Sequence, residues 1–208
     1  MMCKNLISLC LVLALASVSY GVVIGNFEQQ MDNFKETWET PAPTFTYSAT
    51  GATLGASSLA VQPNVTGWQW SFMREGILDL DTYDTLSVDV TWVAAEWGNA
   101  TWVNFKDIAI NSDGPSGWLQ LIPTDPANPD YPGSWDPSWG DHTRTLTWDL
   151  SGYDATGATW MQLIFSSNFD TGTTAVGKYY IDNVQLIPEP MTIALLGLGG
   201  LALLRRKR

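Results

Sequence analysis

Apolar and polar residues alternate along several short segments of this chain, and this two-residue period restricts its fold more than any other feature. The period is clearest where Leu86, Val88, Val90 and Trp92 alternate with Ser87, Asp89 and Thr91. It recurs in residues 145–150 and 160–165, and it puts Trp68, Trp70 and Phe72 on one face. Because consecutive side chains of a strand point to opposite faces, these segments predict strands with one buried face.

Further apolar segments are separated by Gly, Asn, Asp and Pro, which end strands and form turns. They lie at residues 44–48, 58–62, 101–110, 118–122 and 178–187. About nine short strands, each with one apolar face, bury those faces by packing as two layers. The sequence therefore predicts an all-β fold, a two-sheet antiparallel sandwich of the jelly-roll type. Its core is expected to hold Trp68, Trp70, Trp92 and Trp148.

The predicted sandwich, residues 22–187, has the length of one domain and can bury a sizeable core. The only two cysteines, Cys3 and Cys10, precede it, so disulfides do not stabilise it. The whole chain is acidic, with a formal net charge of −11 at pH 7. Because an acidic surface repels phosphate backbones, we expect no nucleic-acid partner.

Residues 1–21 have the pattern of a secretory signal peptide. An early cation, Lys4, precedes an apolar stretch over residues 6–16, and small residues follow. This order is typical of an export signal that is removed from the mature protein. The sequence therefore predicts that the sandwich is exported.

Residues 188–208 combine a rigid break, an apolar segment and a basic end. The break is Pro188, Glu189 and Pro190, and the end is Arg205, Arg206, Lys207 and Arg208. Between them, residues 191–204 carry no charge. As a helix, this segment spans roughly 21 Å, short of the ~30 Å hydrocarbon core of a bilayer. We therefore expect a short C-terminal hydrophobic helix that anchors the chain to a membrane transiently.

These three parts resemble the PEP-CTERM sorting signal in type, order and position at the chain end. The resemblance covers residues 188–208 and implies recognition and removal of the tail by an exosortase-type membrane peptidase. It implies delivery to the cell surface or the extracellular matrix, with membrane contact through the helix before processing. An ordinary C-terminal membrane anchor is the alternative.

One long segment, residues 111–142, interrupts the strand pattern with prolines and aspartates, apart from the short strand predicted at 118–122. Long irregular segments in a compact domain are usually functional or disordered, and large aromatic residues argue against disorder. Flat aromatic rings can stack on the apolar faces of sugars. The sequence therefore predicts glycan contact by Tyr131, Trp135 and Trp139, with Trp118 as a further candidate. The alternative is that Trp135 and Trp139 simply cap an open end of the sandwich.

Three short motifs resemble the galactose-binding-like jelly rolls of non-catalytic carbohydrate-binding modules. They are Gly25-Asn26-Phe27-Glu28, the small-residue turn and strand at 55–61, and the last strand at 179–186. The resemblance implies polysaccharide binding without catalysis. It also implies one structural Ca²⁺ between the first and last strands, with Glu28 and Asp182 as ligands. The alternative is that Glu28 is solvated and Asp182 is a turn or edge residue.

Catalytic patterns are weak. His142 is the only histidine, and Ser138 and Asp141 lie near it in the sequence, but no Gly-x-Ser-x-Gly elbow for a serine nucleophile is present. Paired carboxylates could hydrolyse a glycan, but no spacing singles out a pair. We therefore expect a non-enzymatic surface or matrix protein that binds polysaccharide. A small glycan hydrolase and a purely structural surface protein are the alternatives.

Overall fold

The computed structural model describes residues 21–64, 67–80, 82–97, 100–105, 107–169 and 177–188. The predicted signal peptide lies outside the described residues except for Gly21, and the predicted sorting tail does so except for Pro188, which ends the last strand. The C-terminal helix over 191–204 therefore remains a prediction.

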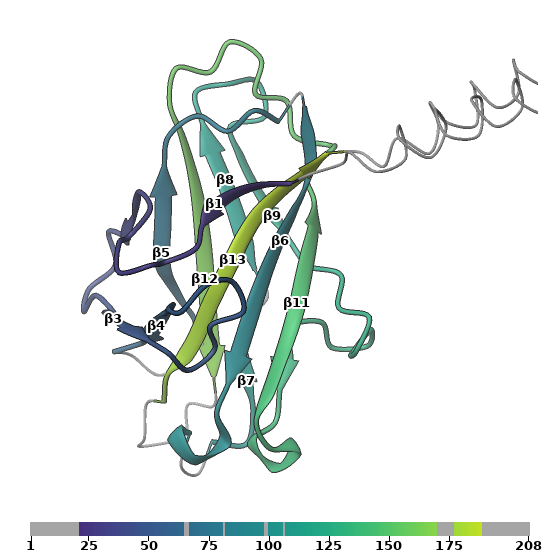
Figure 1. Ribbon diagram of the computed structural model, residues 1–208. Helices are drawn as coiled ribbons and strands as arrows, with labels where there is room; N and C mark the ends of the chain where they lie inside the picture. Colours follow the sequence, from purple (N-terminus) through teal and green to yellow (C-terminus); the bar gives the residue numbers. More distant parts are fainter. Residues whose placement is uncertain are drawn as a thin grey trace, which may run out of the picture.

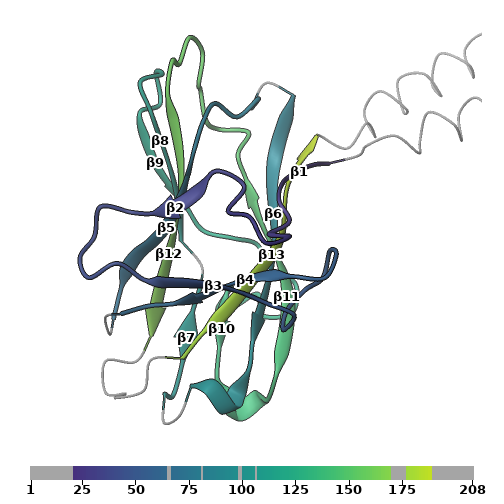
Figure 2. The same ribbon diagram turned by 60° about the vertical axis from the view of Figure 1, so that its left-hand side comes forward.

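Two antiparallel sheets face each other across one core, which confirms the predicted sandwich (Figures 1 and 2). Within the described ranges the first sheet has six strands in the order β11-β6-β13-β4-β3, with β1 also paired to β13. Its strands are β1 (Val22–Gly25), β3 (Thr44–Ser48), β4 (Ser58–Gln62), β6 (Tyr83–Trp92), β11 (His142–Asp149) and β13 (Tyr179–Pro188).

The second sheet has seven strands among the described residues, in the order β10-β7-β12-β5-β2, and β8 pairs with both β12 and β9. Its strands are β2 (Phe34–Glu36), β5 (Gln69–Glu75), β7 (Val103–Asn104), β8 (Ile108–Ser112), β9 (Trp118–Leu121), β10 (Ser134–Trp135) and β12 (Met161–Phe169). Two short 3₁₀ turns, η1 (Ala94–Glu96) and η2 (Pro137–Trp139), lie beside this framework. In the described part of the chain, no helix is long and apolar enough to cross a bilayer.

The core follows the two-residue period. In β6 the side chains of Leu86, Val88, Val90 and Trp92 are fully buried. They belong to one apolar cluster that includes aromatic residues of the second sheet. Phe72 of β5 stacks on Phe165 of β12 with ring centres 4.6 Å apart. Alternation thus places one face of each sheet inside, as the sequence predicts.

Two predictions about this segment are wrong, namely that Trp68, Trp70 and Phe72 share one face and that Trp68 belongs to the core. Phe72 pairs with Phe165, but Trp70 pairs with Ser166, so Ser71 is an extra residue in β5. Such a bulge shifts the alternation by one position. Trp70 is buried, as predicted, but it lies on the opposite face of the sheet from Phe72 and packs in a separate cluster with Met73, Ala109 and Ile164. Trp68 is 44% exposed rather than buried.

The predicted strand at 101–110 is two strands. Its first part, β7, pairs with Asn168 and Phe169 at the end of β12, whereas its second part, β8, pairs with the beginning of β12. Between them the main-chain carbonyl of Asp107 accepts a hydrogen bond from the amide of Ser166. This interruption lets β7 also pair with β10, which carries the irregular segment into the second sheet.

Candidate functional site

The irregular segment forms one wall of a solvent-open cavity of about 300 Å³, here called the loop cavity. Its lining residues are Thr101, Trp102, Tyr131, Ser134, Trp135, Asp136 and Trp139. Three of the four predicted glycan-contact residues therefore lie together. Tyr131 is 71% exposed, and Trp139 and Trp102 are also exposed. Trp102 was missed because it lay within a segment assigned to a strand.

Trp135 was predicted to contact glycan, but only 1% of this residue is exposed. It lies in β10 opposite Val103, and its ring stacks on Trp92 with centres 6.1 Å apart and planes 11° apart. Its indole Nε1 donates a hydrogen bond to the carbonyl oxygen of Gly140 at 3.0 Å. Pairing of β10 with β7 turns this ring toward the core, so Trp135 supports the cavity from below.

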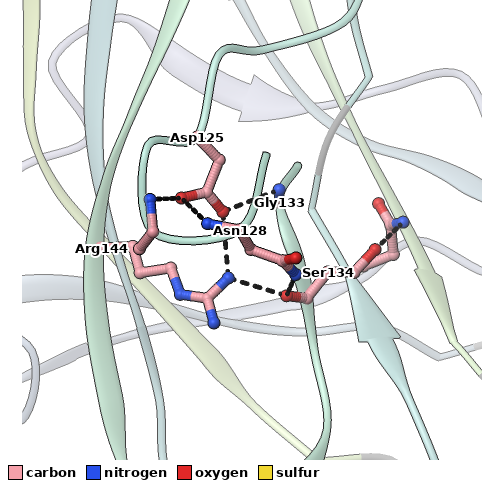
Figure 3. A network of polar contacts seen from close by, with 7 residues as sticks. Asp125, Asn128, Gly133, Ser134 and Arg144 are labelled. Carbon is pink, nitrogen blue, oxygen red and sulfur yellow. Dashed lines mark hydrogen bonds and ion pairs between the residues drawn. The ribbon is translucent and has the colours of Figure 1, made fainter. Parts of the chain in front are cut away.

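A buried ion pair holds the segment against the first sheet (Figure 3). Arg144 Nη1 of β11 lies 3.0 Å from Asp125 Oδ2, and both side chains are almost fully buried. Arg144 Nη1 also donates to the carbonyl oxygen of Ser134 at 2.9 Å. A buried charge needs a partner and further hydrogen bonds, and this geometry supplies both.

The loop backbone bonds to the Asp125 carboxylate, as Figure 3 shows. Oδ1 accepts hydrogen bonds from the amides of Ala127 at 3.1 Å and Asn128 at 3.3 Å. Oδ2 accepts a hydrogen bond from the amide of Gly133 at 3.2 Å. Asn128 Nδ2 donates to the carbonyl oxygen of Ser134 at 3.3 Å. One carboxylate thus fixes both ends of the turn that carries Tyr131.

Arg144 also fixes the aromatic rings. Its guanidinium carbon lies 5.5 Å from the ring centre of Trp139 and 5.9 Å from that of Trp92. Both distances are within the range of a cation–π contact. At the rim, Asp136 Oδ1 accepts the amide hydrogen of Ser138 at 2.8 Å, which caps η2 and orients the carboxylate.

The fourth predicted residue, Trp118, lies on another surface. Trp70 contacts Trp68 and Trp118 edge-on, with ring centres 4.7 Å and 5.5 Å away. We call these three residues the sheet-face cluster. Trp70 is buried between two exposed rings, and it packs with Met73, Ala109 and Ile164 on the outer face of the second sheet. Trp68 and Trp70 were not predicted as contact residues, because the alternation of the sequence does not reveal the bulge at Ser71.

Polar side chains accompany the sheet-face cluster. Leu119 and Leu121 of β9 pack against the main core, so Trp118 and Gln120 point to the outer face. Strand register then places Asn111 opposite Trp118, and Gln162 opposite both Asn111 and Glu75. Gln162 Nε2 donates to Glu75 Oε1 at 3.2 Å. The outer face therefore combines aromatic rings with amide and carboxylate groups.

Both predicted calcium ligands bind the same turn. Glu28 Oε1 accepts hydrogen bonds from the amides of Ala56 at 2.7 Å and Ser57 at 2.9 Å. Asp182 Oδ2 accepts hydrogen bonds from the amides of Thr53 at 2.6 Å and Leu54 at 2.7 Å. Burial raises the pKa of Asp182 above its usual value, against the lowering effect of these amides. The two carboxylates thus attach residues 53–57 to the first sheet.

Calcium fits this place only in part. Asp182 Oδ1 is buried and has no hydrogen-bond partner, so it could accept a cation. Glu28 Oε1 already accepts two amides, and no described group of three or more histidine, cysteine, aspartate or glutamate side chains could hold a metal. Since calcium takes six to eight oxygens, the remaining ligands would be carbonyl groups or water. Calcium binding stays a prediction.

His142, Asp141 and Ser138, the weak catalytic candidates of the sequence, each have a structural role in the fold. His142 begins β11 opposite Trp92. Asp141 Oδ1 accepts a hydrogen bond from the amide of Ala94 at 2.8 Å, which ties β11 to η1. Ser138 lies in η2, where its amide donates a hydrogen bond to the capping carboxylate of Asp136. These contacts explain the three residues as parts of the fold.

Comparison with known proteins establishes the fold. No model of a known protein family matches this chain, and no curated protein is similar to it in sequence. Among solved structures, it is similar to a xylan-binding domain of carbohydrate-binding module family 22, with 18% identity and a TM-score of 0.51 over 84% of this chain and 97% of that one. It is also similar to a family 28 module specific for non-crystalline cellulose, with 15% identity and a TM-score of 0.50 over 80% and 95% of the two chains.

The chain is also similar to a family 11 module of a Clostridium thermocellum cellulosomal cellulase, with 16% identity and a TM-score of 0.50 over 83% of this chain and 96% of that one. At these identities the likeness concerns the fold. The domain therefore has the jelly-roll sandwich architecture of carbohydrate-binding modules.

Proposed function

We propose that the sandwich is a non-catalytic polysaccharide-binding domain and that the sheet-face cluster is its main contact surface. The observation that carries this proposal is the pair of exposed rings, Trp68 and Trp118, on either side of the buried Trp70. Exposed aromatic patches on a rigid sheet mark binding sites, since the rings offer contact area at low entropic cost. Sugar rings stack on such faces, while Gln120, Asn111 and Gln162 can bond to their hydroxyl groups.

The solved structures support a polymeric ligand. The family 22 domain is described as xylan-binding and the family 28 module as specific for non-crystalline cellulose. An open sheet face suits a chain, because sugar residues can extend beyond the protein at both ends. The loop cavity, with the predicted residues Tyr131 and Trp139, is a second candidate surface for the same class of ligand.

A binding test separates this proposal from its alternatives. The purified full-length protein is run in native gels that contain soluble xylan, a soluble cellulose derivative or mannan. Retardation by at least one polymer is expected, and Trp118→Ala and Trp68→Ala should weaken it about tenfold, the effect of losing a central aromatic contact. Tyr47→Ala removes an exposed ring from β3 of the first sheet and serves as the control.

Retardation that survives both tryptophan substitutions would exclude the sheet-face cluster as the main site. Release of reducing ends from any of these polymers would favour the small hydrolase instead. A folded protein that neither binds nor cleaves them would favour a purely structural surface protein.

We also propose export and surface sorting of this domain. The support is the sequence of residues 1–21 and the PEP-CTERM resemblance of residues 188–208, with an exosortase-type peptidase as processing partner. Replacing Pro188, Glu189 and Pro190 by alanine should leave the tail on the protein and reduce its release to the cell surface or matrix. Mass spectrometry of the mature protein measures this, and unchanged processing would contradict the proposal.

A further inference from the structure

We propose that the loop cavity is a preformed pocket for the terminal sugar of a glycan chain, distinct from the sheet-face cluster. This inference adds a second subsite to the proposed polysaccharide binding. The position, size, chemistry and rigidity of the cavity each support this assignment.

The size of the loop cavity limits the length of glycan that it can enclose. The cavity measures about 300 Å³, at the lower end of the roughly 300–1,000 Å³ typical of small-molecule sites. Such a volume encloses one or two sugar residues rather than a chain. The sheet-face cluster, by contrast, lies on an outer sheet surface where no wall limits the ligand. The two surfaces therefore suit different parts of a glycan.

Chemistry favours a neutral, hydroxyl-rich ligand. The rings of Trp102, Tyr131 and Trp139 supply apolar stacking area, and Ser134 and Asp136 supply polar groups. A carboxylate and a hydroxyl can bond to sugar hydroxyl groups. An aromatic cage would also attract an organic cation, but Arg144 already places a guanidinium against Trp139. This fixed positive charge disfavours a second cation at the same ring.

Rigidity lowers the cost of binding. Arg144 and Asp125 hold the segment from beneath, and Asp125 bonds to three of its amides. Asn104 Nδ2 of β7 donates to Ser134 Oγ at 2.9 Å, which ties the cavity wall to the second sheet. Because the pocket exists before the ligand arrives, little conformational entropy is lost on binding.

The pairing of the strands in the second sheet places the loop cavity near the sheet-face cluster. Ser167 of β12 pairs with Gln69 of β5. The next residue of β12, Asn168, pairs with Asn104 of β7, and Asn104 in turn pairs with Ser134 of β10. Trp68 directly precedes Gln69. Trp68 and Ser134 thus lie at the same end of the second sheet, separated by about three strand spacings, or roughly 14 Å. One glycan chain can contact Trp68 and place its end in the pocket.

The test compares small sugars with polymers on the full-length protein. Titration calorimetry uses methyl glycosides and disaccharides of xylose, glucose, mannose and galactose. At least one should bind, and Trp139→Ala and Tyr131→Ala should each weaken that binding about tenfold. Trp118→Ala, the matched control on the other surface, should leave small-sugar binding unchanged while it weakens polymer binding.

Three results would contradict the proposed sugar pocket. These are no binding of any small sugar, small-sugar binding that survives both pocket substitutions, and binding of tetramethylammonium in place of sugars. If polymer binding is then lost only in Trp118→Ala, the proposed polysaccharide binding stands and the pocket alone is excluded. Because Tyr131 and Trp139 are exposed, their removal should not unfold the domain, and far-ultraviolet circular dichroism verifies this.

Discussion

Arg144 Nη1 and Asp125 Oδ2 lie 3.0 Å apart, and this contact joins β11 of the first sheet to a segment 19 residues earlier in the chain. Neither residue is near the surface. Their pairing converts a proline-rich segment into a fixed wall for the loop cavity. It also brings the Arg144 guanidinium under Trp139 and beside Trp92.

Breaking this pair should destabilise the domain strongly. Asp125→Ala leaves a buried guanidinium without its carboxylate and frees three loop amides, which we expect to cost about 3–5 kcal/mol of unfolding free energy. Urea unfolding followed by tryptophan fluorescence measures the loss. Asp130→Ala, an exposed aspartate of the same segment, is the control and should change stability little. A loss below about 1 kcal/mol in Asp125→Ala would contradict a clamping role.

Buried and outward-facing aromatic residues near the bulge at Ser71 should contribute very differently to stability. Phe165→Ala removes a fully buried ring that stacks on Phe72, so we expect a loss of about 3–5 kcal/mol. Trp68→Ala removes an exposed ring and should cost less than about 1 kcal/mol. Thermal and urea unfolding of the two variants give this comparison. A large loss in Trp68→Ala would place that ring in the structural core after all.

The stability contribution of Asp182 should fall as pH rises. Burial raises its pKa above the usual 3.8, so the folded protein holds this proton more strongly than the unfolded chain does. The cost of ionising Asp182 is therefore absent below pH 3.8 and appears as pH rises through the raised pKa. Asp182→Asn cannot ionise, and its side-chain oxygen can still accept the amides of Thr53 and Leu54.

Urea unfolding of both proteins across this pH interval, with chelator present, is the measurement. The variant should gain stability relative to the natural protein as pH rises. The opposite slope would mean that the amides, rather than burial, control the pKa of Asp182.

Calcium, if bound as predicted, should stabilise the fold by mass action. A ligand of the folded state at 100 times its Kd adds about 2.7 kcal/mol. The unfolding temperature should therefore rise with calcium concentration, return to its starting value on addition of chelator, and become insensitive to calcium in Asp182→Asn. Magnesium is the control, because its smaller octahedral shell fits such sites poorly. An unfolding temperature that calcium does not change would leave Asp182 and Glu28 with only their role in attaching residues 53–57.

Local patterns were sufficient for the strands and the fold class. Residues 44–48 and 58–62 were predicted with the bounds that β3 and β4 have. The inward side chains of β6 were also predicted, because alternation depends only on the geometry of one strand. The sequence likewise singled out Tyr131 and Trp139, since prolines and aspartates flank exposed aromatic residues there.

Pairing between distant strands decided the rest. The bulge at Ser71 exists through the register of β5 with β12, so the outward position of Trp70 is not encoded in its own segment. The meeting of Trp68, Trp70 and Trp118 depends on β5, β12, β8 and β9 lying side by side. The pairing of Arg144 with Asp125 depends on folding the irregular segment back onto β11. The sequence by itself determined which residues alternate and where the chain turns, because those are short-range properties. Only the tertiary structure decided which side chains meet, because contacts across sheets depend on register and burial throughout the domain.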